Sequence, residues 1–585
     1  MPSNYHMVVV NLIASAILGI GILFYKFIYP KKKINLFILL LLISILPIIS
    51  IFRPGTYESG DFNIHIYRII TFYNSLKEGI FMPSWAADLN ATYGNPLFIF
   101  NYNLPYYIIS LFHFFGFSFI TSTKLYLAFV MYFSGIAMYL WFNKLTGNKL
   151  ASFTASIFYL FSPYHLIDVH FRATLGESTI FFLLPMFFYT IINYYDHKKV
   201  NYLIYICLTS ALLFLAHPLL AIPSIGIGFL YSLFIFITNR KTVLLINVFL
   251  SLVLGVLGAS YLWIPFLLFS GFTFSNGTPN LYFYPFSYLF YSPWRLGFLF
   301  QGPKGELQLI IGYTQIFVVI ISLIILCKNL IYSKIRHDYI FWISIFLLLV
   351  FFLSPISIFI WIFFPLLWML LPYGRLLLLI SFSTSMIAGY FTIFCQKFKR
   401  GQGLILILIL ITILYSILNW GHRRVIEDIN DDYLIKNVPY STLNEGLTAY
   451  FLNNKWADVN NFWFDKIPKN HLEIINGVGY VKQIKRNSIS HRYEVNAKTS
   501  LKVKENTLFF PGWQLRIGNK IIPIYPGERG IINADLPMGK YEIELKYEDI
   551  FIYKLSKFIA IFFFSVLIFM ILIYSISSRR FNSKP

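Results

Sequence analysis

INLFILLLLISILPIISIF, residues 34–52, is followed after a short linker by Gly60-Asp61-Phe62-Asn63-Ile64-His65-Ile66-Tyr67-Arg68. The first stretch is apolar and has the length that a membrane-spanning helix needs. In the second, Asp61, His65 and Arg68 are spaced i, i+4, i+7, so a helix would place all three on one face. Ionisable side chains beside a spanning segment are costly and are usually functional. The two stretches predict a membrane protein with a polar site at the mouth of a helix.

The composition also indicates an integral membrane protein. Of the 585 residues, 57% are hydrophobic and 12% are charged, whereas soluble domains carry about 25% charged residues. The mean hydropathy is +0.66. The net charge of +22 does not indicate nucleic-acid binding, because Lys and Arg cluster in short loops between apolar runs, as on the cytoplasmic side of membrane proteins. The three cysteines are far apart and show no metal-binding spacing, so neither a disulfide nor structural zinc is expected.

About thirteen apolar runs are long enough to span a bilayer. They are approximately 7–28, 34–52, 124–143, 150–166, 178–195, 200–216, 219–237, 243–268, 307–327, 339–354, 376–395, 403–420 and 554–576. If these helices alternate in direction, the basic loops from Lys31-Lys32-Lys33 to Arg579-Arg580 all fall on the cytoplasmic side. If the apolar stretches 95–119 and 356–371 also crossed the membrane, the basic loops would no longer all fall on the cytoplasmic side. These two stretches are therefore predicted to lie in the outer interface.

The outer side then holds a first loop at 53–123, a short loop at 165–178, a third loop at 270–306 and a hydrophilic segment at 421–553. Arg492 to Ala497 and Tyr541 to Tyr547 alternate apolar and polar residues, and Gly518-Asn519-Lys520 is a hairpin-turn candidate. This pattern predicts an antiparallel β-sandwich; the part before about Ile475 is predicted to be mixed or helical. The expected domains are a transmembrane domain at 1–420, an extracytoplasmic β domain at 421–553, and a last span with a basic tail at 554–585.

Asp61 is the first candidate for chemistry. Transfer of a sugar to a hydroxyl needs a carboxylate that takes the acceptor proton, and His65 and Arg68 on the same face would assist and contact an anion. The alternative is an ordinary solvated helix start, with Asp61 favouring the helix dipole.

Further candidates are expected on the same side of the membrane. A guanidinium binds phosphate oxygens in a bidentate fork, so Arg172, Arg375 and Arg295 are candidate substrate contacts. Glu177 is a second candidate carboxylate, although Arg172 and Glu177 could simply pair across a short loop, and Arg375 could snorkel to lipid headgroups. Trp85 and Tyr93 are candidates for stacking on a sugar or for the aromatic belt.

Several motifs together resemble one family. They are Gly60-Asp61-x-x-x-His65-x-x-Arg68, Pro83-Ser84-Trp85, Tyr93-Gly94-Asn95-Pro96, Tyr106-Tyr107, Arg172 to Glu177 with Pro185, Phe509-Phe510-Pro511-Gly512-Trp513 and Leu536-Pro537-x-Gly539-Lys540-Tyr541. They resemble GT-C-like bacterial membrane proteins of the YfhO type and of the type labelled "6-pyruvoyl-tetrahydropterin synthase-related". The resemblance implies a GT-C fold, a polyprenyl-phosphate sugar as donor, an active site on the outer face and Asp61 as the acidic residue of the first loop.

No cofactor is assigned with certainty; for a divalent metal (Mg²⁺ or Mn²⁺), Asp61 and Glu177 are the candidate ligands. GT-C proteins often carry two adjacent acids in the first loop, whereas Phe62 follows Asp61 here, so metal dependence is left open.

The predicted function is an inverting glycosyltransferase of the plasma membrane. It would transfer a sugar from a polyprenyl phosphate to an envelope glycan, teichoic acid or lipid on the outer face. The Walker sequence of ATP-driven transporters is missing. The alternatives are a lipid-linked glycan transporter or flippase, which predicts polar residues through the depth of the bundle, and a non-catalytic envelope protein that binds glycan through its β domain.

Overall fold

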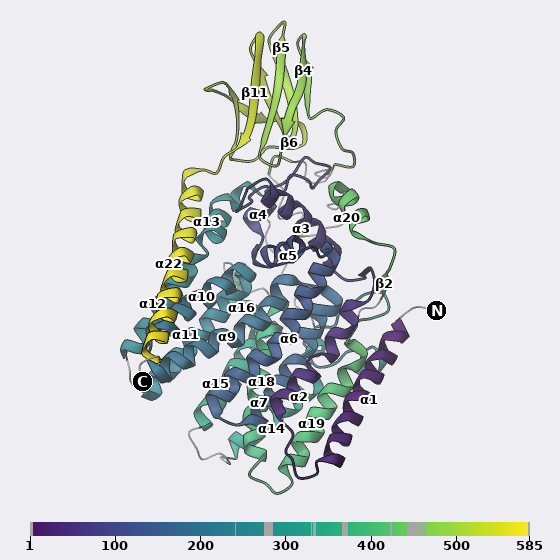
Figure 1. Cartoon of the computed structure of the whole chain (residues 1–585), viewed down its shortest axis with the longest axis vertical. Helices are drawn as coiled ribbons and strands as arrows, with labels where there is room; N and C mark the ends of the chain where they lie inside the picture. The colour runs from purple at the N-terminus through teal and green to yellow at the C-terminus, as the bar shows by residue number, and fades with distance from the viewer. Residues whose placement is uncertain are drawn as a thin grey trace.

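The computed structural model describes residues 4–239, 242–273, 285–328, 330, 335–364, 373–421, 424–440, 455–457 and 464–582. Figure 1 shows an elongated body of packed helices with a β-structure at one end. Helix α22 (Phe551–Asn582) runs along one side of the body and α1 (Asn4–Ile28) along the opposite side. The end of the body that carries the β-structure is called the β end below.

The long helices are built from the apolar runs of the sequence. Besides α1 and α22 they are α6 (Phe119–Thr146), α7 (Lys149–Leu160), α9 (Leu175–His197), α10 (Val200–Ala216), α11 (Pro218–Asn239), α12 (Thr242–Gly258), α13 (Ser260–Phe269), α14 (Tyr313–Cys327), α15 (Ile335–Leu353), α18 (Leu376–Cys395) and α19 (Gly401–Ser416). Local signals set some ends: the Ser118 side chain caps the first turn of α6, and Gly147 ends it with a positive φ, as is usual at helix C-termini.

Short elements connect the long helices. They are α2 (Leu36–Ile43), η1 (Leu46–Phe52), α3 (Phe62–Lys77), α4 (Leu97–Phe100), α5 (Leu104–Phe114), α8 (Pro163–Leu166), η2 (Ile167–Arg172), η3 (Ser270–Phe272), η5 (Phe286–Leu289), η6 (Arg295–Gly297), η7 (Pro355–Ser357), α16 (Ile358–Phe363), η8 (Tyr373–Arg375), η9 (Ile417–Asn419) and α20 (Asp431–Asn437).

Among the described residues, eight helices are long and apolar enough to cross a membrane, or up to ten if each of two bent pairs is one span. The bends are 48° between α7 and the segment Pro163–Arg172, and 65° between α12 and the segment Ser260–Phe272. The predicted runs that remain match the shorter apolar helices Leu36–Phe52, Val200–Ala216 and Tyr313–Cys327. The prediction of a polytopic helical protein is confirmed, while the number of helices that cross stays a prediction.

The helices differ sharply in burial. The most apolar windows of α18 and α9 are 94% and 78% buried, whereas those of α1 and α22 are 11% buried. The two outlying helices thus expose apolar side chains over most of their length, as lipid-facing helices do. Helix α22 is held to the body at close approaches such as Gly258, where a Cβ would lie 2.3 Å from the Phe563 ring.

Two connections were predicted differently from what is observed. Residues 165–178 are not a loop: η2 continues the helical chain from Pro163, and His165, Asp168 and His170 are buried. The prediction was wrong because apolar Ile167, Val169 and Phe171 pack in the core and polar Asp168 is paired with Arg172, which allows the whole segment to be buried. Residues 95–119 form only the short helices α4 and α5, in keeping with an interfacial segment; the stretch 356–371 lies partly outside the described residues.

The β-structure consists of two antiparallel sheets. One has the order β3-β6-β10-β9 and the other β4-β5-β11-β7-β8. Their strands are β3 (Leu472–Asn476), β4 (Gly479–Arg486), β5 (Ser490–Ala497), β6 (Leu501–Leu508), β7 (Trp513–Ile517), β8 (Lys520–Ile522), β9 (Ile524–Pro526), β10 (Ile531–Leu536) and β11 (Gly539–Tyr547). Inward residues of both sheets, such as Val495, Val503 and Ile543, share one hydrophobic cluster. The predicted sandwich and the β7–β8 hairpin at Gly518 are confirmed.

The segment before the sandwich is irregular. It contains β2 (Val425–Ile426), which pairs with β1 (Thr56–Tyr57), and the short helix α20. Much of the stretch that was predicted as mixed or helical lies outside the described residues.

Candidate active site

Four segments of the helical body meet at one place. They are the N-terminus of α3, the end of η2, the N-terminus of α9 and η8. Backbone hydrogen bonds hold the first two together: Gly60 N donates to Phe171 O at 2.9 Å, and Asp61 N donates to Arg172 O at 2.8 Å. Residues that are far apart in sequence thus bring their charged side chains to one place, called the charged cluster below: Asp61, Arg68, Asp168, Arg172, Glu177 and Arg375.

Arg172 is the centre of the charged cluster. Its Nη1 donates to Asp168 Oδ1 at 2.7 Å and to Glu177 Oε2 at 2.9 Å, and its Nη2 donates to Glu177 Oε1 at 2.8 Å. The pair with Glu177 is therefore bidentate, the geometry in which a guanidinium binds carboxylate most strongly. Tyr164 completes the arrangement, because its hydroxyl accepts from Arg172 and donates to Glu177 at 2.8 Å.

Arg375 joins the cluster from η8. It forms an ion pair with Glu177, with Nε 2.9 Å from Glu177 Oε1, and its side chain is 37% exposed against 1% for Glu177. Three carboxylates and three guanidiniums are thus gathered together, so each charge has an opposite charge nearby. Of the two arginines that pair with Glu177, Arg375 is the more exposed. It is therefore the one that an anionic ligand can reach more directly.

Asp61 stands at the start of α3 and is half-buried. Its side chain makes no capping bond to the helix, so at the helix start it acts only through the helix dipole. Burial raises the pKa of the Asp61 carboxyl above its ordinary value, and Arg172 and Arg68 partly offset this rise. A carboxylate with a raised pKa beside two cations has the character of a general base.

His65 lies one helical turn along α3 and is buried. Its Nδ1 is 3.1 Å from the Tyr106 hydroxyl and its Nε2 is 3.4 Å from the Tyr102 hydroxyl. Burial and the neighbouring Arg68 lower the pKa of His65 well below its ordinary value, so the ring is neutral near pH 7. The structure therefore joins His65 to two tyrosines, which hold the ring in place beside the charged cluster.

Trp85 and Tyr93 do not face an open site. Trp85 is 2% exposed and packs edge-on against Trp513, with ring centroids 5.4 Å apart. Tyr93 stacks on Phe464 at 3.7 Å, and its carbonyl accepts a hydrogen bond from Leu508 N. Both belong to the hydrophobic cluster of the sandwich. These contacts give the two rings a packing role between the first loop and the sandwich.

This position leads to a stability prediction. Trp85→Ala should destabilise the contact between loop and sandwich by about 3–5 kcal/mol, as expected for a buried large side chain. Limited proteolysis and thermal unfolding in detergent measure the effect. The exposed aromatic Tyr480 is the control, because Tyr480→Ala should change stability by less than about 0.5 kcal/mol. Unchanged stability in Trp85→Ala, with a raised KM for a sugar substrate, would instead support stacking on a sugar.

Arg295 lies on η6 and is exposed, with φ +44°. It lies in the predicted third outer loop (270–306) and not in the charged cluster.

A divalent metal does not fit the charged cluster as it is arranged. Both oxygens of Glu177 already accept from guanidinium groups and from Tyr164. Among the residues that the structure describes, no group of three or more His, Cys, Asp or Glu side chains has the arrangement of a metal site. The carboxylates are instead neutralised by arginines.

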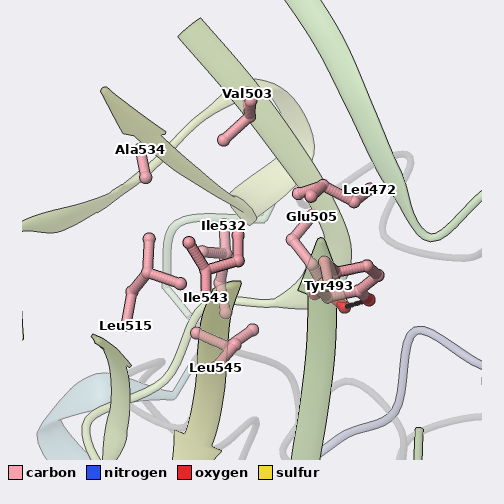
Figure 2. A pocket seen from close by; sticks show the side chains of 9 residues that line it. All are labelled: Leu472, Tyr493, Val503, Glu505, Leu515, Ile532, Ala534, Ile543 and Leu545. Atoms are coloured by element: carbon pink, nitrogen blue, oxygen red, sulfur yellow. Dashed lines mark hydrogen bonds between the residues drawn. The ribbon is translucent and has the colours of Figure 1, made fainter. Parts of the chain in front are cut away.

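The interior of the sandwich offers no room for a substrate. Figure 2 shows the side chains that line its cavity, which measures about 10 Å³. A cavity of this size holds at most one water. Glu505 and Tyr493 are its polar lining residues, and the Tyr493 hydroxyl donates to Glu505 Oε1 at 2.8 Å.

Tyr164 and Asp168 were not chosen as site residues from the sequence. Tyr164, Asp168 and Arg172 are spaced four apart, so a helical reading of 163–172 would have placed them on one face. This helical spacing was missed because the stretch was predicted to be a loop. Tyr102 lies between His65 and His217, with ring centroids 6.2 Å and 5.5 Å away, and only the tertiary fold brings these three rings together.

Comparisons with known proteins identify a family. Residues 100–420 match the profile of the "6-pyruvoyl-tetrahydropterin synthase related domain; membrane protein". The matched region includes Arg172, Glu177 and Arg375 but begins after α3. An uncharacterized protein of Lactococcus lactis subsp. cremoris (strain MG1363) is 23% identical over 213 residues, which are 36% of this chain and 35% of the relative. The match therefore spans about a third of that relative's length.

One solved structure is similar at a low level. It is the archaeal oligosaccharyltransferase AglB from Archaeoglobus fulgidus in complex with an inhibitory peptide and a dolichol-phosphate. The TM-score is 0.40 and the identity is 12%, over 72% of this chain and 56% of that chain.

Proposed function

The chain belongs to the family of membrane proteins that contain the 6-pyruvoyl-tetrahydropterin synthase related domain, and we propose that it is an inverting glycosyltransferase of the GT-C type. The donor is a sugar on a polyprenyl phosphate, and the acceptor is a hydroxyl of an envelope glycan, teichoic acid or lipid. The observation that carries the proposal is the charged cluster, in which a half-buried carboxylate adjoins several guanidiniums. The motif resemblance to GT-C proteins supports the same reaction.

In this proposal the β end faces the outside of the cell. Residues 1–420 are the catalytic membrane domain with about twelve of the thirteen predicted spans, residues 421–553 are the extracytoplasmic domain, and residues 554–585 are the last span with its cytoplasmic tail. This orientation puts the basic loops inside, as the distribution of Lys and Arg favours. It also places the charged cluster where the phosphate of a lipid carrier lies.

Four of the charged residues then have a task. Asp61 takes the proton of the acceptor hydroxyl, whose oxygen forms a bond to the anomeric carbon of the sugar as the bond from that carbon to the phosphate oxygen breaks. The polyprenyl phosphate leaves with the bonding electron pair. Arg375 contacts the phosphate, and its charge stabilises the departing anion. Arg172 holds Glu177, which in turn orients Arg375, so Arg172 acts mainly through its neighbours.

The direct test is transfer by the purified protein in lipid nanodiscs. A panel of polyprenyl-phosphate monosaccharides is supplied with an envelope extract as acceptor, and free polyprenyl phosphate is measured. The proposal predicts release of polyprenyl phosphate and a product of inverted anomeric configuration. A product of retained configuration would contradict a reaction by single displacement, for which one catalytic base is enough.

The raised pKa of Asp61 predicts a pH dependence. The base must be deprotonated, so kcat/KM should fall on acidification at a higher pH than an ordinary, exposed aspartate would give. Arg68 lowers the pKa of Asp61, so its removal in Arg68→Gln should move the acid limb to still higher pH. Rate profiles of both proteins measure the shift. If the acid limb of Arg68→Gln were unchanged or moved to lower pH, the group that titrates would not be Asp61.

A flippase is less well supported. The charged residues of this site lie at the ends of helical segments, at the N-termini of α3 and α9 and just before α18, whereas transport favours polar groups near the middle of the membrane.

A further inference from the structure

A cleft of about 520 Å³ lies apart from the charged cluster. It is formed where the end of η1, the N-terminus of α6 and the β2–α20 segment meet. Figure 1 shows β2 and α20 on the side of the body that carries the N-terminus, opposite α22. The volume is within the range of about 300–1,000 Å³ that is usual for ligand pockets.

The charges in the cleft walls are largely satisfied by the protein itself. Lys124 Nζ donates to the carbonyl oxygens of Arg53 and Gly55. Asp431 accepts from Phe119 N at 2.6 Å and Ile120 N at 3.2 Å at the start of α6. Arg53 interacts electrostatically with Glu427. Two cationic side chains and three carboxylates line the cleft, so their charges nearly balance and the cleft offers neither a strong positive nor a strong negative field to a ligand.

Exposed hydrogen-bonding groups remain for a ligand. The carboxylates of Glu427 and Asp432 and the Thr121 hydroxyl line the cleft beside apolar Phe52 and Ile120, while the Ser118 hydroxyl caps α6 and donates to Thr121 Oγ1 at 2.8 Å. A sugar hydroxyl both donates and accepts, and the C–H faces of a sugar ring suit apolar contacts. A neutral, polyhydroxylated ligand matches this lining better than a phosphate or a metal cation does.

The cleft is also close to Asp61 along the chain. Gly55 borders the cleft, and the β1–β2 pairing begins one residue later at Thr56 and Ile426. Gly55 has φ +65°, and a Cβ there would lie 2.2 Å from Ile426 O, so this crossing needs glycine. Asp61 follows Gly55 by six residues, so the Cα atoms of the two residues are at most about 22 Å apart.

We propose that this cleft binds neutral sugar units of the acceptor glycan, a few units away from the hydroxyl that reacts. The assignment to the acceptor rests on the proposed function, whereas sugar binding in the cleft stands on the lining alone. The site would select acceptors by length, because one bound end of the glycan would place the other end at Asp61.

The test uses the full-length protein in nanodiscs and a defined probe. The probe is a mixture of fluorophore-labelled neutral oligosaccharides of three to six sugars, released from the cell envelope of the source organism by mild acid. Binding is measured by microscale thermophoresis. The variant Glu427→Ala/Asp432→Ala should weaken binding at least tenfold, and Thr121→Trp, which fills the cleft, should do the same. Asp428→Asn is the matched control, since this exposed carboxylate is next to Glu427 but does not line the cleft.

The outcomes separate this site from the proposed reaction. Asp61→Asn should bind the oligosaccharides as the unaltered protein does, so oligosaccharide binding without any sugar transfer would overturn the proposed function and leave the cleft assignment standing. Binding that is unaffected by the cleft variants would overturn the cleft assignment. So would failure of the unaltered protein to bind the mixture, or binding of glycerophosphoethanolamine in its place, which would indicate a lipid headgroup.

Discussion

Asp61→Asn should reduce sugar transfer by about 100-fold to 10,000-fold, the range that a positioned general base contributes. The amide has nearly the same shape as the carboxylate but cannot take a proton. Because Asp61 makes no capping bond to α3, the change should leave the helix and the fold in place. The loss should appear in kcat, measured as release of polyprenyl phosphate, with little change in donor KM.

The control for this variant is Glu58→Gln, which removes an exposed carboxylate from the same connection and should leave the rate within a factor of about two. Equal activity of Asp61→Asn and the unaltered protein would remove Asp61 from the chemistry. Equal loss in both variants would indicate a general effect of charge on this loop.

Glu177→Ala should cost about 3–5 kcal/mol of stability, because it removes the buried partner of the largely buried Arg172 guanidinium. Glu177 accepts from Tyr164 and Arg172 and forms an ion pair with Arg375, so a single truncation breaks the connection between α8, η2, α9 and η8. Thermal unfolding of the purified protein in nanodiscs measures the effect. Glu177→Gln should cost less, since the amide oxygen still accepts from one arginine.

The same helix provides a matched control. Asp196 lies at the other end of α9 and pairs with Lys144 at 2.9 Å, but its side chain is 47% exposed. Exposed pairs contribute about 0–1 kcal/mol, so Asp196→Ala should change stability little. If the two variants lost equal stability, the charged cluster would be no more than a surface ion pair.

The sequence allowed the helical body to be predicted well, because apolar runs of spanning length leave the backbone few alternatives in a bilayer. The β-sandwich followed from period-two alternation in strands such as β5 and β11. The neighbourhood of Asp61, His65 and Arg68 at the start of α3 was predictable from their helical spacing. Arg172 and Glu177 were considered as a pair, and the structure shows that pair.

Other parts of the site depend on tertiary contacts that a sequence does not display. The bidentate bond within the η2–α9 turn looks local, but Arg375 reaches Glu177 from nearly two hundred positions later in the chain. Trp85 and Tyr93 have the residue types of a sugar platform, and only the docking of the sandwich shows that they are buried. An aromatic side chain at the mouth of a membrane domain serves packing as readily as binding.

The most direct measurement of the central claim is the lipid-linked sugar pool in cells whose only copy of the gene carries Asp61→Asn. A transferase that has lost its base leaves the donor unused, so a polyprenyl-phosphate sugar should accumulate in the outer leaflet, where an impermeant reagent labels it. Accumulation confined to the inner leaflet would indicate a flippase. A lipid-linked pool identical to that of cells with the unaltered gene would contradict the account.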